Sequence, residues 1–280
     1  IEEHDVTGSG NNTDFIGHGS ATAGLIAQLA PSVKKIISVK VFNREGRTNY
    51  STLMNAYDLL MSLSNQIDIV NFSLGATQKV VEIDARHNQL VAKGVRTVCA
   101  SGNTSQDTGS PSTAEKSFSI GALTPQGEMT DFSSYDPEYN TPSICALGQN
   151  IKLARASGTS IGEVLDEEWV KASGTSFAAP IATAAIATYL SVKGKFNRND
   201  FYLTADDITE LPKDGQGSLN LLDAMSIEED EEISGDDDVK QVSRIGVQTY
   251  GNKNLIWLHD SWLEPGSYDV EFKDKVLKVV

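Results

Sequence analysis

The sequence has few cysteines, few basic residues and no long hydrophobic run, and each shortage excludes a class of protein. Two cysteines among 280 residues exclude a small fold that depends on several disulfide bonds. The 23 lysines and arginines are outnumbered by 38 acidic residues, so the net charge is −15 and nucleic acid is not an expected partner. No apolar stretch approaches the roughly 20 residues that a transmembrane helix needs, and no signal peptide is visible. We therefore expect a globular protein with no membrane span and some preference for cationic ligands.

Metal-binding patterns are scarce as well. Cys99 and Cys145 lie in separate apolar segments, which is typical of buried free thiols rather than of a disulfide or a metal site. His4, His87 and His259 have no partner pattern, so we expect them to be surface or structural residues. No metal ion and no cofactor is expected.

The chain alternates between short apolar segments and longer segments with helical spacing. Residues 67–72 are short and largely apolar, whereas residues 52–64 carry apolar side chains three or four positions apart. This alternation favours an α/β fold with a mostly parallel sheet and helices on both faces, in which ligands bind beyond the carboxyl ends of the strands. Strands are predicted over 35–42, 67–72, 95–100, 117–122 and 143–147, and helices over 52–64, 80–93 and 176–193.

Three polar residues at the ends of such elements have the chemistry of a serine hydrolase. Ser176 begins an Ala-rich helix, where free N–H groups can stabilise an oxyanion, although a serine there can equally be a simple helix cap. Pro180 is expected in the first turn of that helix, where its missing N–H costs little. His18, at the start of another helix, is a candidate general base, and Asn103, after an apolar strand, is a candidate oxyanion donor.

These segments resemble the motifs of the subtilisin-like serine peptidases. Gly17–Gly24 is similar to the family's histidine block, Ser101–Asn103 to its oxyanion block and Ser173–Pro180 to its serine block, while Val70–Gly75 is similar to its substrate-pairing strand. The resemblance covers about residues 4–226 of the sequence. It implies a subtilisin-like fold and a serine endopeptidase that acts on peptides or proteins. The substrate-binding residues that it implies are Ser73, Leu74, Gly75, Ala100, Ser101 and Gly102, with the floor of the primary specificity pocket near Ser112 and Thr113.

The family's catalytic aspartate has no obvious counterpart. In the family it ends an apolar strand well before the histidine, whereas residues 1–4 do not have the pattern of a buried strand. Asp5 and Asp14 are the nearest acids before His18, and we expect neither to be catalytic. We expect the orienting carboxylate to come from an N-terminal segment or propeptide outside these residues. The alternative is an impaired pseudoprotease that serves as a binding or regulatory scaffold; a sedolisin-like site is disfavoured because it would have no use for His18.

The charge pattern divides the chain. Residues 1–226 are expected to form the catalytic domain without its first strand, 227–238 an acidic linker, and 239–280 a small β module with turns at 251–252 and 265–266. Eight of the eleven residues from 228 to 238 are acidic. They could alternatively bind calcium, but their spacing matches no calcium loop.

Overall fold

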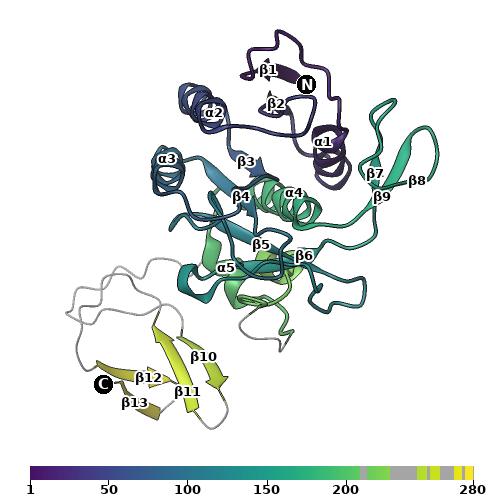
Figure 1. Ribbon diagram of the computed structural model, residues 1–280. Helices are drawn as coiled ribbons and strands as arrows, with labels where there is room; N and C mark the ends of the chain where they lie inside the picture. The colour runs from purple at the N-terminus through teal and green to yellow at the C-terminus, as the bar shows by residue number, and fades with distance from the viewer. Residues whose placement is uncertain (209–212, 228–244, 251–252, 259–267, 273–274, 280) are drawn as a thin grey trace. The chain divides into compact units, whose positions relative to one another are not determined.

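A computed structural model describes residues 1–208, 213–227, 245–250, 253–258, 268–272 and 275–279 (Figure 1). The chain divides into two compact units, Ile1–Ile227 and Glu228–Val280. The motif residues singled out above all lie in the first unit.

The first unit is built on a four-stranded parallel sheet between two layers of helix (Figure 1). Within strand β4, Val98 and Ala100 pack on one face and Cys99 on the other, as the two-residue period of a strand requires. The predicted α/β fold with a parallel sheet is confirmed. The strand order is β3 (Ile69–Phe72), β4 (Arg96–Ala100), β5 (Phe118–Leu123) and β6 (Ile144–Leu147); α4 (Thr175–Lys193) covers one face, and α2 (Tyr50–Ser62) and α3 (Val81–Ala92) cover the other.

A second pair of parallel strands lies outside this sheet. Strand β1 (Glu2–Asp5) pairs with β2 (Ile37–Lys40), and β2 forms no ladder with β3. A strand therefore does precede His18, which the sequence did not indicate. The polar sequence of β1 has no apolar period, and its strand conformation depends on backbone hydrogen bonding to β2. Its side chains remain half-exposed, so the expectation that it is not a buried strand holds.

Helix α4 is the central element of the unit. It packs against the strands of the parallel sheet on one side and against α1 (His18–Leu29) on the other. Its length and apolar composition would satisfy the requirements for a membrane-spanning helix, but most of its surface is buried inside the unit. Small residues make this burial possible, and Ala178, Ala179 and Ala182 are fully buried against the sheet. The remaining elements are an antiparallel sheet in the order β7 (Ile151–Ala154), β9 (Trp169–Ala172), β8 (Glu163–Val164), the 3-10 helix η1 (Pro137–Tyr139), and the short helices α5 (Arg198–Leu203) and α6 (Leu221–Ser226).

The second unit contains two antiparallel hairpins, which confirms the predicted C-terminal β module. They are β10 (Ile245–Tyr250) with β11 (Lys253–Leu258), and β12 (Tyr268–Phe272) with β13 (Lys275–Val279). The acidic stretch 228–238, the predicted turns at 251–252 and 265–266, and His259 lie outside the described residues.

The predictions that the cysteines are buried free thiols and that the histidines outside the motifs are surface or structural residues hold for the described residues. Cys99 and Cys145 are buried free thiols. His87 is buried between the hydroxyls of Tyr57 and Thr97, at 3.2 and 2.8 Å, and is structural. His4 pairs with Glu2 at the surface. Within the described part of the chain, no group of three or more His, Cys, Asp or Glu side chains is placed to hold a metal ion.

Candidate active site

Ser176 lies in the first turn of α4, beyond the carboxyl ends of β3 and β4. Its Oγ is 3.5 Å from the Ser73 carbonyl oxygen, and its side chain is only half-buried. None of the described residues accepts a hydrogen bond from the Ser176 backbone N–H. The backbone N–H of Ser176 is therefore an unpaired donor that lies within the partial positive charge of the helix N-terminus.

Pro180 lies in the second turn of α4 and not in the first, because the helix begins at Thr175. A proline there cannot donate the helical hydrogen bond to the Ser176 carbonyl four residues earlier. The hydroxyl of Ser73 donates to that carbonyl instead, at 2.7 Å. The freed acceptor thus ties the backbone of Ser176 to the segment that follows β3.

Asn103 is held in one orientation by the residue before Ser176. Its Oδ1 accepts hydrogen bonds from the Thr175 backbone N–H at 2.9 Å and the Thr175 hydroxyl at 3.0 Å. With Oδ1 engaged, the donor group of the amide is Nδ2, for which the described residues provide no acceptor. Thr175 belongs to the Gly-Thr-Ser motif that the sequence identifies, but only the structure shows that it orients Asn103.

His18 is the first residue of α1 and is brought near Ser176 by the packing of α1 on α4. The centroid of its ring is 5.7 Å from that of Phe177, the residue after Ser176. Gly17 is required before it, because its φ is +89° and a Cβ there would lie 2.3 Å from the Thr159 hydroxyl. Burial lowers the pKa of His18 and the charge of Asp14 opposes that shift. The neutral imidazole, which can act as a base, is therefore favoured.

Neither nearby aspartate orients His18. The Asp5 carboxylate accepts from Thr7, Ser9 and the Asn11 backbone within its own turn. The Asp14 carboxylate accepts from the backbone N–H groups of Ile16, Gly17 and Ser20 and from the Ser20 hydroxyl, so it fixes the entry to α1. No residue in the described ranges hydrogen-bonds to the His18 imidazole.

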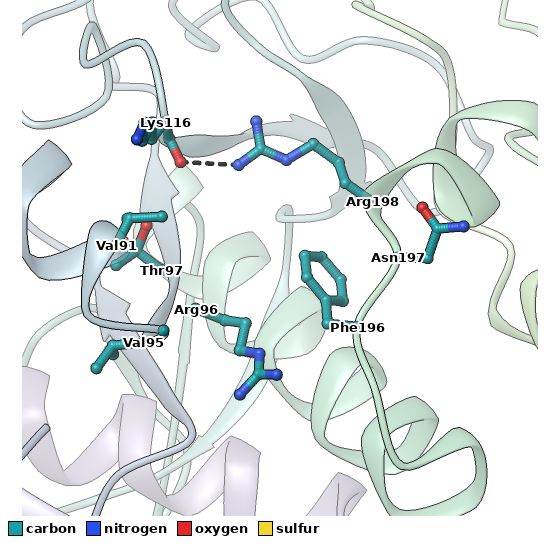
Figure 2. A pocket seen from close by; sticks show the side chains of 9 residues that line it. Val91, Val95, Arg96, Thr97, Lys116, Phe196, Asn197 and Arg198 are labelled. Carbon is teal, nitrogen blue, oxygen red and sulfur yellow. Dashed lines mark hydrogen bonds between the residues drawn. The ribbon is translucent and has the colours of Figure 1, made fainter. Parts of the chain in front are cut away.

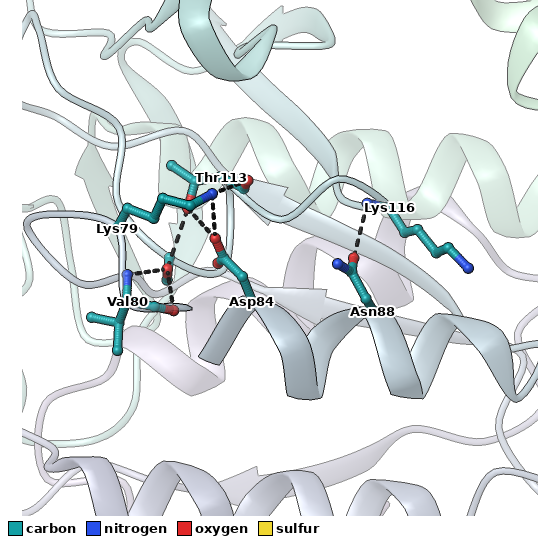
Figure 3. A network of polar contacts seen from close by, with 7 residues as sticks. Lys79, Val80, Asp84, Asn88, Thr113 and Lys116 are labelled. Atoms are coloured by element: carbon teal, nitrogen blue, oxygen red, sulfur yellow. Dashed lines mark hydrogen bonds and ion pairs between the residues drawn. The ribbon is translucent and has the colours of Figure 1, made fainter. Parts of the chain in front are cut away.

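A cleft of about 190 Å³ opens beside Ser176 and Asn103. Five of the six predicted substrate-binding residues line it, and Ser73 instead anchors Ser176 from behind. Ser112 and Thr113, near which the floor was predicted, do not line this cleft: both are buried, and Thr113 donates to Asp84 at 2.8 Å (Figure 3). The lining residues are Leu74, Gly75, Ala76, Thr77, Ala100, Ser101, Gly102, Asn103, Thr104, Asp107, Gly109, Thr175 and Ser176.

A larger cavity, of about 350 Å³, lies at the amino end of β4 (Figure 2). It is lined by Val95, Arg96 and Phe196, among others, and Arg198 crosses it to donate to the Lys116 carbonyl at 2.7 Å. None of the motif residues lines it. The smaller cleft is therefore the candidate active site, since Ser176 and Asn103, the predicted nucleophile and oxyanion donor, both line it.

The sequence model of the subtilase family matches residues 2–212. The chain belongs to the subtilase family. Subtilisin DY of Bacillus licheniformis is 27% identical over 234 residues, which cover 77% of this subtilase and 80% of that protein. The major intracellular serine protease of Bacillus subtilis (strain 168) is 27% identical over 191 residues, which cover 62% of this chain and 55% of that one. This subtilase spans about half the length of several of its relatives.

Two solved structures share its fold. The prenylagaramide maturation protease PagA superposes with a TM-score of 0.62 at 21% identity, over 80% of this chain and 85% of that one. A cold-adapted subtilisin-like serine proteinase superposes with a TM-score of 0.63 at 21% identity, over 79% of both chains. The predicted subtilisin-like fold is confirmed by these likenesses.

Proposed function

We propose that this subtilase is a serine endopeptidase. His18 takes the proton of Ser176, and Ser176 Oγ attacks the peptide carbonyl to give an acyl-enzyme that water then hydrolyses. The Asn103 amide and the Ser176 N–H stabilise the oxyanion. The observation that carries the proposal is the orientation of Asn103, whose acceptor oxygen is held by Thr175 so that its donor faces the cleft of Ser176.

Residues 73–75 and 100–102 are proposed to bind the substrate backbone. Each segment continues from the carboxyl end of a parallel strand and borders the cleft. An extended peptide can pair with such exposed edges through its main chain, which positions the scissile carbonyl without restricting the side chains. We assign this activity to residues 1–226 and not to the β module.

The orienting carboxylate is proposed to come from a segment outside these 280 residues. Strands β2 and β3 both belong to parallel pairs, yet among the described strands β2 pairs only with β1 and β3 only with β4. Val39 on β2 and Val70 on β3 nevertheless pack around the same apolar cluster. An added strand at these open edges could carry an acidic side chain toward His18, in an N-terminal segment or propeptide.

Hydrolysis of internally quenched peptides tests the proposal. The full chain is expected to release fluorescence, and Ser176→Ala to abolish it, because the nucleophile is lost. Ser173→Ala is the matched control, since its hydroxyl only accepts a hydrogen bond from the Asn150 backbone at the surface. Hydrolysis that survives in Ser176→Ala would refute the assignment.

The acidic limb of the pH–rate profile is expected below pH 6.5, the ordinary pKa of histidine. Burial lowers the pKa of His18, so the neutral base persists to lower pH and activity falls only as the pH drops through that lowered pKa. The measurement is kcat/KM from pH 4 to pH 9, which reports the free enzyme. A limb above pH 6.5 would instead indicate that a nearby anion stabilises the protonated ring.

Asp5→Asn is expected to change kcat by less than about tenfold, because the Asp5 carboxylate serves its own turn. Loss of a true orienting aspartate costs on the order of ten-thousand-fold. The steady-state rates of the two chains decide between these values. A collapse of the rate in a variant that melts at the wild-type temperature would place Asp5 in the catalytic machinery.

The scaffold alternative has one observation in its favour. Within the described ranges, no carboxylate hydrogen-bonds to His18, so the site could bind peptides without cleaving them. A chain that binds peptides in the cleft but never releases product would support this alternative over the endopeptidase.

A further inference from the structure

Asp107 is the charged residue of the cleft beside Ser176. The other residues that line the cleft are neutral, and no lysine or arginine is among them. The Asp107 side chain is exposed, and no described residue forms a hydrogen bond or an ion pair with its carboxylate. An unpaired negative charge therefore faces the space next to the nucleophile.

Hydrogen bonds hold the loop that carries Asp107. Ser105 donates its backbone N–H to Phe132 at 3.0 Å and its hydroxyl to Asp131 at 2.6 Å. Asp107 itself has a φ of +56°, a left-handed conformation that aspartate adopts more readily than most residues. Because Ser105 ties the loop to residues 131–132 just before this turn, the backbone that carries Asp107 has a defined place beside the cleft.

The rest of the cleft suits a long aliphatic chain that ends in a cation. Its walls contain the small residues Gly75, Ala76 and Ala100, with Leu74 as the larger apolar side chain. A volume of about 190 Å³ suits one side chain rather than a large ligand. Lysine and arginine can lay their methylene stems along such a surface and extend the charged head beyond it.

Among the described residues, no lysine or arginine forms an ion pair with Asp107. Lys79 follows the wall formed by residues 74–77, but its ammonium pairs with Asp84 at 3.0 Å (Figure 3). It also lies 4.2 Å from the centre of the Tyr139 ring. The net charge of −15 adds a long-range attraction for cationic peptides. We propose that Asp107 selects lysine or arginine as the residue on the acyl side of the scissile bond, a proposal that rests on the proposed endopeptidase function.

Binding to a chain that cannot cleave tests this selection separately from catalysis. The full-length Ser176→Ala protein is titrated by calorimetry with two peptide amides that differ only in the last residue, lysine or its uncharged analogue norleucine. We expect the lysine peptide to bind about tenfold more tightly at low salt. Asp107→Asn in the same background should remove this preference and leave the norleucine peptide unaffected.

Asp68→Asn is the matched control, because Asp68 is an exposed acid just before β3, at the other end of the sheet, and its loss changes the net charge equally. A preference that survives Asp107→Asn, equal binding of the two peptides, or no binding of either would overturn the proposal. Reaction of the unmutated chain with a serine-directed fluorophosphonate is read in parallel. If the chain is labelled but shows no lysine preference, only the selectivity is refuted. If it shows a lysine preference but is not labelled, the selectivity is supported and only the peptidase function is refuted.

Discussion

Asn103→Ala is expected to lower kcat about a hundredfold to a thousandfold while KM changes little. The Asn103 amide would donate to the oxyanion of the transition state and not to the ground-state carbonyl, so its loss removes stabilisation that is specific to the transition state. In this subtilase the amide is oriented by two hydrogen bonds from Thr175, so no rearrangement is needed to present the donor. The measurement is the steady-state hydrolysis of a single peptide by both chains.

Asn103→Asp provides a sharper comparison. The aspartate keeps an oxygen that can accept from Thr175 but has no N–H to donate, and its negative charge repels the oxyanion. A fall in kcat at least as large is therefore expected with the local structure retained. A large rise in KM at unchanged kcat in either variant would contradict the oxyanion assignment and would make Asn103 a ground-state binding residue.

Gly109→Ala is expected to destabilise the first unit by about 3 kcal/mol and to disrupt the cleft. A Cβ at this position would lie 1.9 Å from the carbonyl oxygen of Ala76 and 2.9 Å from the backbone nitrogen of Gln78. Both are backbone atoms, and the segments are joined by the hydrogen bond from the Ala76 N–H to Ser110 at 2.7 Å, so neither can move without opening the wall of the cleft. For a unit of this size the melting temperature should fall by roughly 6–12 °C, which calorimetry measures.

Gly19→Ala is the control for that change. A Cβ at Gly19 would make an ordinary contact of 3.6 Å with the Asp14 carboxylate, and alanine favours the helical conformation of α1. Its effect on stability should therefore stay below about 1 kcal/mol. Equal melting temperatures for the two variants would show that the approach of Gly109 to Ala76 is not a constraint on the fold.

The sequence predicts the parallel core well because the spacing of apolar residues in its strands and helices marks the faces that are buried. Helices α2 and α4 and strands β3 to β6 all lie within a few residues of the predicted ranges. Strand β1 could not be predicted in this way. Its sequence is Glu-Glu-His-Asp, and it becomes a strand through pairing with β2, which is more than thirty residues away in the sequence.

The candidate site is only partly readable from the sequence for a similar reason. The motif residues identify Ser176, His18 and Asn103, and their chemistry follows from their types. The floor of the cleft depends instead on how a loop closes. Ser112 and Thr113 are adjacent polar residues that turn inward to hydrogen-bond with Ser119 and Asp84, while a left-handed turn brings Asp107 to the cleft. No local pattern encodes either outcome.

Covalent labelling with a fluorophosphonate, mapped by mass spectrometry, tests the central claim most directly. The reagent reacts with a serine only where a base activates its hydroxyl, so it reports the pairing of Ser176 with His18 without depending on substrate preference. We expect one labelled peptide, containing Ser176, in the full chain, and no labelling in Ser176→Ala or in His18→Ala. A folded protein that never labels, or one that labels at another serine, would contradict the assignment of Ser176 as the nucleophile.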